Sequence, residues 1–97
     1  MILTFHDEGT EDIYHGRNTR KARSACPSEL WRNARMKLQV IRNAKVLSDL
    51  KASRINQLEP LKGDRNGQYS IRINDKYRIC FRWTDAGAER VEIVDYH

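Results

Sequence analysis

Apolar and polar side chains alternate between residues 69 and 83, and this pattern constrains the fold more than any other feature of the chain. A period of two places successive side chains on opposite faces of a β-strand, so the alternation predicts half-buried strands. Asn74-Asp75 divides the segment as a tight-turn dipeptide, and Asp85 to Gly87 supplies a second turn before Val91 and Ile93. We therefore expect three antiparallel strands in a meander, with these side chains on one face: Tyr69, Ile71, Ile73, Tyr77, Ile79, Phe81 and Trp83.

Helical spacing precedes the strands. It predicts one long helix over residues 27 to 43, from four apolar residues at helical intervals: Leu30, Ala34, Leu38 and Ile41. A shorter helix is expected over residues 10 to 15, an edge strand over residues 2 to 5, and a further strand over residues 57 to 61. This order predicts an α+β fold in which an antiparallel-rich sheet carries two helices on one face. At 97 residues the chain fits a single domain.

The charge of the chain is unevenly distributed. The net charge is −4 over residues 1 to 15, +9 over residues 16 to 54 and zero over the remainder. A basic block creates a field that attracts a polyanion such as RNA or DNA, although a solvated helix face and a basic loop would give the same count. Residues 16 to 25 contain no apolar side chain larger than that of alanine, so they predict a flexible basic connection.

Other function classes receive little support. No apolar stretch has the length of a signal peptide or membrane span, so we expect a cytoplasmic protein that does not contact a membrane. In a reducing compartment Cys26 and Cys80 should be free thiols. With three histidines and no ligand-like spacing, neither a metal site nor a cofactor is expected.

Candidate functional residues lie on the polar face of the predicted sheet. Arg72, Arg78 and Arg82 share that face and could hold phosphate, although a solvent-facing sheet could carry the same residues. The loop from Glu59 to Gly67 enters this sheet and is basic and rich in glycine. RNA contacts are also expected from Arg65 of that loop and from the basic side of the long helix, at Arg35 and Lys37.

The residues Asp95-Tyr96-His97 follow the last predicted strand and could complete a nuclease site. RNA cleavage through the 2′-hydroxyl needs a base, cations for the developing charge on phosphorus, and an acid for the leaving oxygen. His97 has the reference pKa nearest neutrality and suits either proton role. Glu59 is the other available carboxylate.

Two segments carry a resemblance to a known family. Residues 58 to 83, LEPLKGDRNGQYSIRINDKYRICFRW, and the terminal VEIVDYH resemble the HigB branch of the RelE toxin superfamily. The pattern Pro-Leu-Lys-Gly, Ser-Ile-x-x-Asn, an aromatic residue before arginine, and Asp-Tyr-His occurs in order. The resemblance implies a RelE-like fold.

The resemblance also implies an activity and partners. Toxins of this branch are mRNA interferases that cut messages in the ribosomal A site. Helix-turn-helix antitoxins of the HigA type neutralise them and link them to operator DNA. By the same resemblance, Lys62 and Arg78 would stabilise phosphate, Tyr96 and His97 would orient RNA and move protons, and Asp95 would support them.

One position departs from the family pattern. Some relatives have histidine directly before the Pro-Leu-Lys-Gly stretch, where this chain has Glu59, so a scheme with two histidines does not transfer. Either Glu59 acts as base and His97 as acid, or the site relies on positioning by the ribosome. Two other functions fit the same fold: a gyrase-inhibiting toxin of the ParE type, and an RNA-binding module without catalysis.

Overall fold

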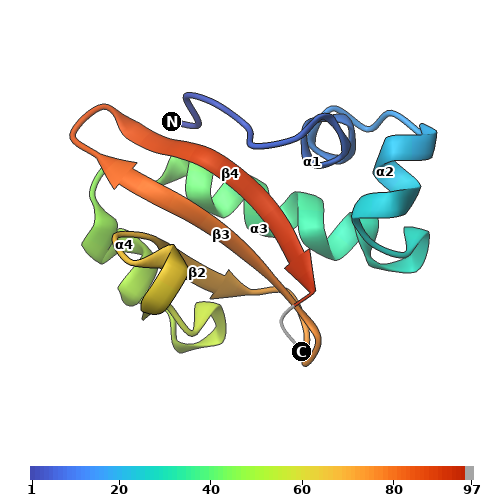
Figure 1. The fold of residues 1–97 in the computed structure, drawn as a ribbon. Helices are drawn as coiled ribbons and strands as arrows, with labels where there is room; N and C mark the ends of the chain where they lie inside the picture. The colour runs from blue at the N-terminus through green and yellow to red at the C-terminus, as the bar shows by residue number, and fades with distance from the viewer. Residues whose placement is uncertain (96–97) are drawn as a thin grey trace.

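The computed structural model describes residues 1–95 and has an α+β architecture. Figure 1 shows a curved antiparallel sheet in front of the long helix, with two short helices beyond one edge. In chain order the elements are α1 (Glu8–Tyr14), α2 (Arg20–Ala25), η1 (Ser28–Leu30), α3 (Trp31–Asn43), α4 (Leu47–Lys51), η2 (Arg54–Asn56), β1 (Glu59–Pro60), η3 (Gly63–Arg65), β2 (Tyr69–Arg72), β3 (Tyr77–Thr84) and β4 (Gly87–Asp95).

The predicted meander is confirmed. Over residues 1–95 the sheet has the strand order β1-β2-β3-β4, and each neighbouring pair is antiparallel. A register shift between Cys80 and Arg82 marks a bulge in the β3–β4 pairing. The first of these strands is shorter than predicted: of residues 57 to 61, only Glu59–Pro60 pairs as β1.

The N-terminal segment lies beside β4, but not as a regular strand. It makes two isolated parallel bridges, Ile2 to Ala88 and Phe5 to Val91. Gly87 permits this approach, because a Cβ on its backbone (φ +139°) would lie 2.3 Å from the carbonyl oxygen of Met1. The predicted edge strand is therefore present only as bridges.

The helices supply one side of the core. Ala34, Leu38 and Ile41 of α3 are fully buried and form one cluster with the apolar face of the sheet, whose fully buried members are Ile71, Ile79, Phe81, Ala88 and Val91. The predicted long helix is thus confirmed. Its first residues form the separate turn η1, and the α-helix begins at Trp31, whose indole nitrogen donates to the carbonyl of Cys26 over 3.0 Å.

Part of the segment from residue 16 to 25, which was predicted as a flexible basic connection, is helical in the structure: α2 occupies Arg20–Ala25. Its flexibility stays a prediction. Thr19 caps this helix by accepting a hydrogen bond from the backbone of Ala22, which is fully buried. A Cβ on Gly9 of α1 would lie 2.4 Å from the carbonyl oxygen of Lys21, so the two helices meet closely at this glycine. Because the two backbones lie so close together, a side chain as small as that of Ala22 is large enough to pack into the core.

Candidate active site

A row of residues crosses the sheet on the face opposite the helices. The pairings Glu59–Ser70, Ser70–Cys80 and Cys80–Glu92 join one residue from each strand. Side chains directly opposite in antiparallel strands point to the same side, so these four share a face. Glu59 lies at one edge and Glu92 on the outermost strand at the other.

Arg78 lies on this same face and is buried, with 8% of its surface exposed. Its Nε donates to the hydroxyl of Ser70 over 2.7 Å, and Nη2 donates to the carbonyl of Gln57. The sequence predicted an open surface arginine. The structure shows instead a guanidinium fixed between β2 and the backbone just before β1, because the segment before β1 folds over it.

The loop between β1 and β2 crosses the same face. Arg65 Nη1 donates to Gln68 and to the carboxylate of Glu92, both over 3.1 Å. This crossing leaves Cys80 fully buried. Burial raises the pKa of the Cys80 thiol, while the nearby charge of Arg65 opposes the rise. Lys62, at the start of the loop, is exposed.

Of the other predicted arginines, Arg82 is exposed and lies against the loop, since its Nη1 would be 3.9 Å from a Cβ on Gly67. Arg72 pairs with Asp75 of the following turn. The charge of Arg72, which was predicted to hold phosphate, is therefore partly neutralised by a carboxylate. The turn that joins β2 to β3 supplies the acid.

Lys37 and Arg35 are held by α3 away from the row. Lys37 donates to the side chain of Asn56 over 3.1 Å, and burial together with the charge of Arg72 lowers its pKa. Arg35 donates to the carbonyl of Ile13 in α1 over 3.1 Å. Because α3 packs on the apolar face of the sheet, the structure does not bring Arg35 together with Arg78.

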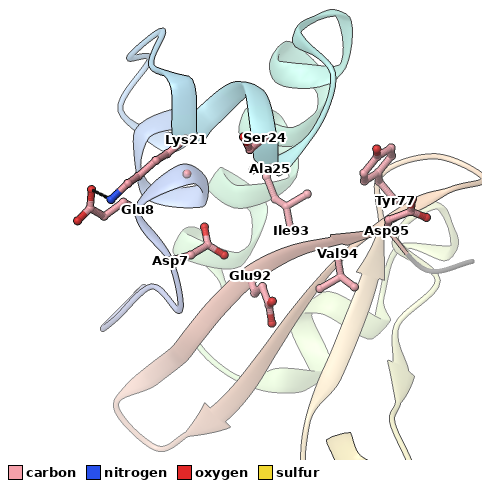
Figure 2. A pocket seen from close by; sticks show the side chains of 11 residues that line it. Asp7, Glu8, Lys21, Ser24, Ala25, Tyr77, Glu92, Ile93, Val94 and Asp95 are labelled. Atoms are coloured by element: carbon pink, nitrogen blue, oxygen red, sulfur yellow. Dashed lines mark hydrogen bonds and ion pairs between the residues drawn. The ribbon is translucent and has the colours of Figure 1, made fainter.

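Asp95 also lies apart from Arg78. It is opposite Tyr77 in the β3–β4 register, whereas Arg78 is opposite Val94, so the two side chains belong to opposite faces. Figure 2 shows Asp95 beside Tyr77 at the end of a pocket of about 650 Å³ between β4 and helices α1 and α2. Four carboxylates and one lysine line this pocket, which disfavours phosphate. The predicted roles of Tyr96 and His97 lie outside the described residues.

Several residues at this face were not predicted from sequence. Ser70 and Glu92 lie in the row, and His6 Nε2 is 3.8 Å from Glu92 Oε2. Ser70 could have been found from the alternation that placed it on the polar face. His6 gave no signal, because its position depends on the pairing of the first residues with β4.

The described residues offer no ready metal site: across positions 1 to 95, no group of three or more histidine, cysteine, aspartate or glutamate side chains could hold a metal ion. Cys26 and Cys80 are free and buried. Burial raises the pKa of Cys26 to about 11. In the same part of the chain, no helix combines the length and apolar character needed to cross a bilayer.

Solved structures share this fold, which is the α+β fold of RelE-like proteins. The YoeB-YefM complex from Staphylococcus aureus contains a chain that superposes with a TM-score of 0.59 and 21% identity, covering 100% of this chain and 98% of that one. A YoeB/ParE toxin from Agrobacterium tumefaciens superposes with a TM-score of 0.55 and 19% identity, covering 99% and 98%. The predicted α+β, RelE-like fold is confirmed.

Sequence comparison identifies the family. The profile described as RelE-like toxin of type II toxin-antitoxin system HigB matches residues 3–97. Toxin HigB-1 of Vibrio cholerae serotype O1 is 34% identical over 88 residues, covering 91% of this chain and 90% of that protein. Endoribonuclease HigB of Proteus vulgaris is 31% identical over 97 residues, covering both chains completely. The chain belongs to the HigB-like family of toxins.

Proposed function

We propose that this HigB-like toxin is an endoribonuclease that cleaves messenger RNA on the ribosome without a metal ion. The relative from Proteus vulgaris, aligned over the whole chain, is named an endoribonuclease. The observation that carries the proposal is the polar sheet face, where exposed Glu59 is paired with Ser70 and Ser70 accepts a hydrogen bond from Arg78. A candidate base and a fixed cation therefore share one surface.

The proposed reaction uses these groups in one displacement. Glu59 takes the proton of the 2′-hydroxyl, and the 2′-oxygen attacks the adjacent phosphorus. The guanidinium of Arg78 and the ammonium group of exposed Lys62 stabilise the added negative charge, and exposed Arg82 contacts the RNA. His97 gives a proton to the departing 5′-oxygen, so the products are a 2′,3′-cyclic phosphate and a 5′-hydroxyl. We assign Asp95 and Tyr96 to positioning, following the family resemblance.

The partners follow from the family. Toxins of type II systems act with an antitoxin, and one structural relative is the YoeB-YefM toxin-antitoxin complex from Staphylococcus aureus. We propose a helix-turn-helix antitoxin of the HigA type, which would link the complex to operator DNA. We also propose the ribosomal A site as the place of action and the cytoplasm as the compartment. Arg65 and Arg72 would contact messenger RNA or ribosomal RNA.

A single assay tests the proposal. Purified protein is incubated with message on stalled ribosomes, and the 3′ ends are mapped for the parent, Glu59→Gln, His97→Ala and the control Glu29→Gln, whose carboxylate lies in η1 on the helical layer. Positioned proton transfer contributes about 100- to 10,000-fold in rate, so the first two variants should lose that much while the control keeps the parent rate.

Two other results would replace the proposal. Parent protein that leaves message intact but inhibits supercoiling by DNA gyrase would support the ParE-type function. Parent protein that binds message without cutting it and spares gyrase would support an RNA-binding module.

A further inference from the structure

A second pocket opens at the edge of β4, on the polar sheet face that carries Glu59 and Arg78. Its volume is about 370 Å³, which lies within the usual range of ligand sites, roughly 300 to 1,000 Å³. All of its lining side chains are polar or charged: His6, Asp64, Arg65, Gln68, Arg90 and Glu92. None of the residues assigned above to proton transfer lines it.

The pocket is organised around the carboxylate of Glu92. Oε1 accepts from Arg65 Nη1 over 3.1 Å, and Oε2 lies 3.8 Å from His6 Nε2. The same Arg65 nitrogen donates to Gln68 Oε1. The Glu92 side chain is 20% exposed and that of His6 is 57% exposed. A shielded acid thus lies beneath an imidazole ring whose surface is open to a ligand.

The backbone at the pocket is strained. Arg90 has φ +53°, in the left-handed region that non-glycine residues rarely adopt, and its amide donates to the hydroxyl of Thr4 over 2.8 Å. Such conformations persist where the surrounding structure holds them, and they are concentrated at functional sites. The strain is local to the two segments that bring His6 and Glu92 together.

The lining chemistry selects among ligands. Two arginines are balanced by two carboxylates, so the pocket has little net attraction for a bare phosphate. Guanidinium, amide and carboxylate groups together present both donors and acceptors, as the edge of a nucleobase requires. Imidazole and guanidinium planes are also surfaces on which unstacked RNA bases pack.

The pocket is placed to act on the same strand of RNA as the candidate base. Glu92 and Glu59 are the ends of one row across four strands, and three spacings of about 4.8 Å put them roughly 14 Å apart on one face. One RNA strand that lies at Glu59 can therefore also reach the pocket at Glu92.

We propose that the pocket of His6, Arg65, Gln68 and Glu92 binds one unstacked base of the RNA substrate and sets the sequence context of cleavage. The imidazole of His6 packs on the base, while Glu92 and Arg65 form hydrogen bonds with its edge. This inference rests on the proposed nuclease function and adds the group that reads the sequence.

The test compares cleavage positions rather than total activity. 3′ ends are mapped on one set of ribosome-bound messages for the parent, His6→Ala and Glu92→Gln. The matched controls are His15→Ala, whose Nε2 is also 3.8 Å from a glutamate, and Glu89→Gln, on the same strand outside the pocket. A good side-chain pair to a base discriminates by ~10-fold or more, so both pocket variants should flatten the preference at one nucleotide position by about that factor. The controls should keep the parent's distribution.

A second measurement separates this inference from the nuclease proposal. The four nucleoside 5′-monophosphates are titrated into the parent and Glu92→Gln, while the imidazole resonances of His6 and His15 are followed by NMR. The expected result is a shift at His6 that differs between the four bases and is lost in Glu92→Gln. A parent that does not cleave but shows these shifts would overturn only the nuclease proposal.

The inference is overturned if folded His6→Ala and Glu92→Gln cleave with the parent's position preferences, or if His6 responds equally to all four nucleotides. If Glu92→Gln unfolds, His6→Ala decides the cleavage test, because His6 is largely exposed.

Discussion

Arg78 Nε donates a hydrogen bond to the hydroxyl of Ser70 over 2.7 Å, and Ser70 is fully buried. The cation that the nuclease proposal places beside phosphorus is thus held by β2 before any substrate arrives. A fixed donor needs no reorganisation as charge develops, which is the main source of electrostatic catalysis. The same contact makes Arg78 a structural residue.

Arg78→Ala should therefore lower both stability and activity. It removes the donors to Ser70 and to the Gln57 carbonyl. Buried acceptors left unpaired cost roughly 1–3 kcal/mol, so we expect a loss of that size in the free energy of unfolding, measured in urea. Arg82→Ala, at an exposed position, is the control and should change stability by less than about 0.5 kcal/mol. An unchanged unfolding free energy for Arg78→Ala would show that the buried contacts contribute nothing.

Glu59→Gln should separate activity from stability. Glu59 is exposed on the two-residue strand β1, so the free energy of unfolding of Glu59→Gln should lie within about 0.5 kcal/mol of the parent value. If Glu59 is the base, the rate on ribosome-bound message should fall by about 100-fold or more. A rate within twofold of the parent would assign the carboxylate a scaffold role and leave proton transfer to other groups.

Asp12 should make the free energy of unfolding depend on pH in the acid range, below pH 3.8. Its carboxylate accepts from the Thr19 hydroxyl over 2.6 Å and from Arg17 over 3.2 Å, and the Thr19 bond is the main reason that its pKa lies below the ordinary 3.8. A lowered folded-state pKa gives stability that is complete above pH 3.8 and is lost as pH falls through the folded value. Asp12→Asn should thus be less stable than the parent at pH 7, and the difference should narrow below pH 3.8. A difference independent of pH would contradict this linkage.

The two cysteines should resist chemical modification in the native protein. At pH 8 a thiol with a pKa of about 11, as at Cys26, is roughly 0.1% thiolate, and both side chains are buried. Reaction with a chromogenic disulfide reagent should therefore follow the urea unfolding curve. Labelling of the folded protein at the rate of free cysteine would show that the core opens far more often than the structure implies.

Much of the fold could be predicted because periodicity reports local structure. The alternation at β2 and β3 and the helical spacing in α3 are set by burial on one side, and both are confirmed. The prediction failed at α2, where burial depends on Ala22 and on the close approach of Gly9 to Lys21, which no count of large apolar residues detects.

The sequence predicted which residues lie on the polar sheet face better than it predicted how they are arranged there. Alternation correctly placed Arg78 on the polar face, but not the backbone of Gln57 that covers it. Asp95 was grouped with Arg78 through the family resemblance, whereas strand register places their side chains on opposite faces. The pairing of His6 with Glu92 joins distant parts of the sequence, and alternation carries no information about such contacts.

The bridges between the N-terminal segment and β4 also determine when the molecule can finish folding. Thr4 and Arg90, and likewise Thr10 and Ile93, are joined by hydrogen bonds across 86 and 83 residues of chain. Contacts between such distant residues form late and slow the folding of a small domain. During synthesis the first residues emerge long before their partners on β4 exist. The edge of the polar sheet face is therefore completed only after nearly the whole described chain has been translated.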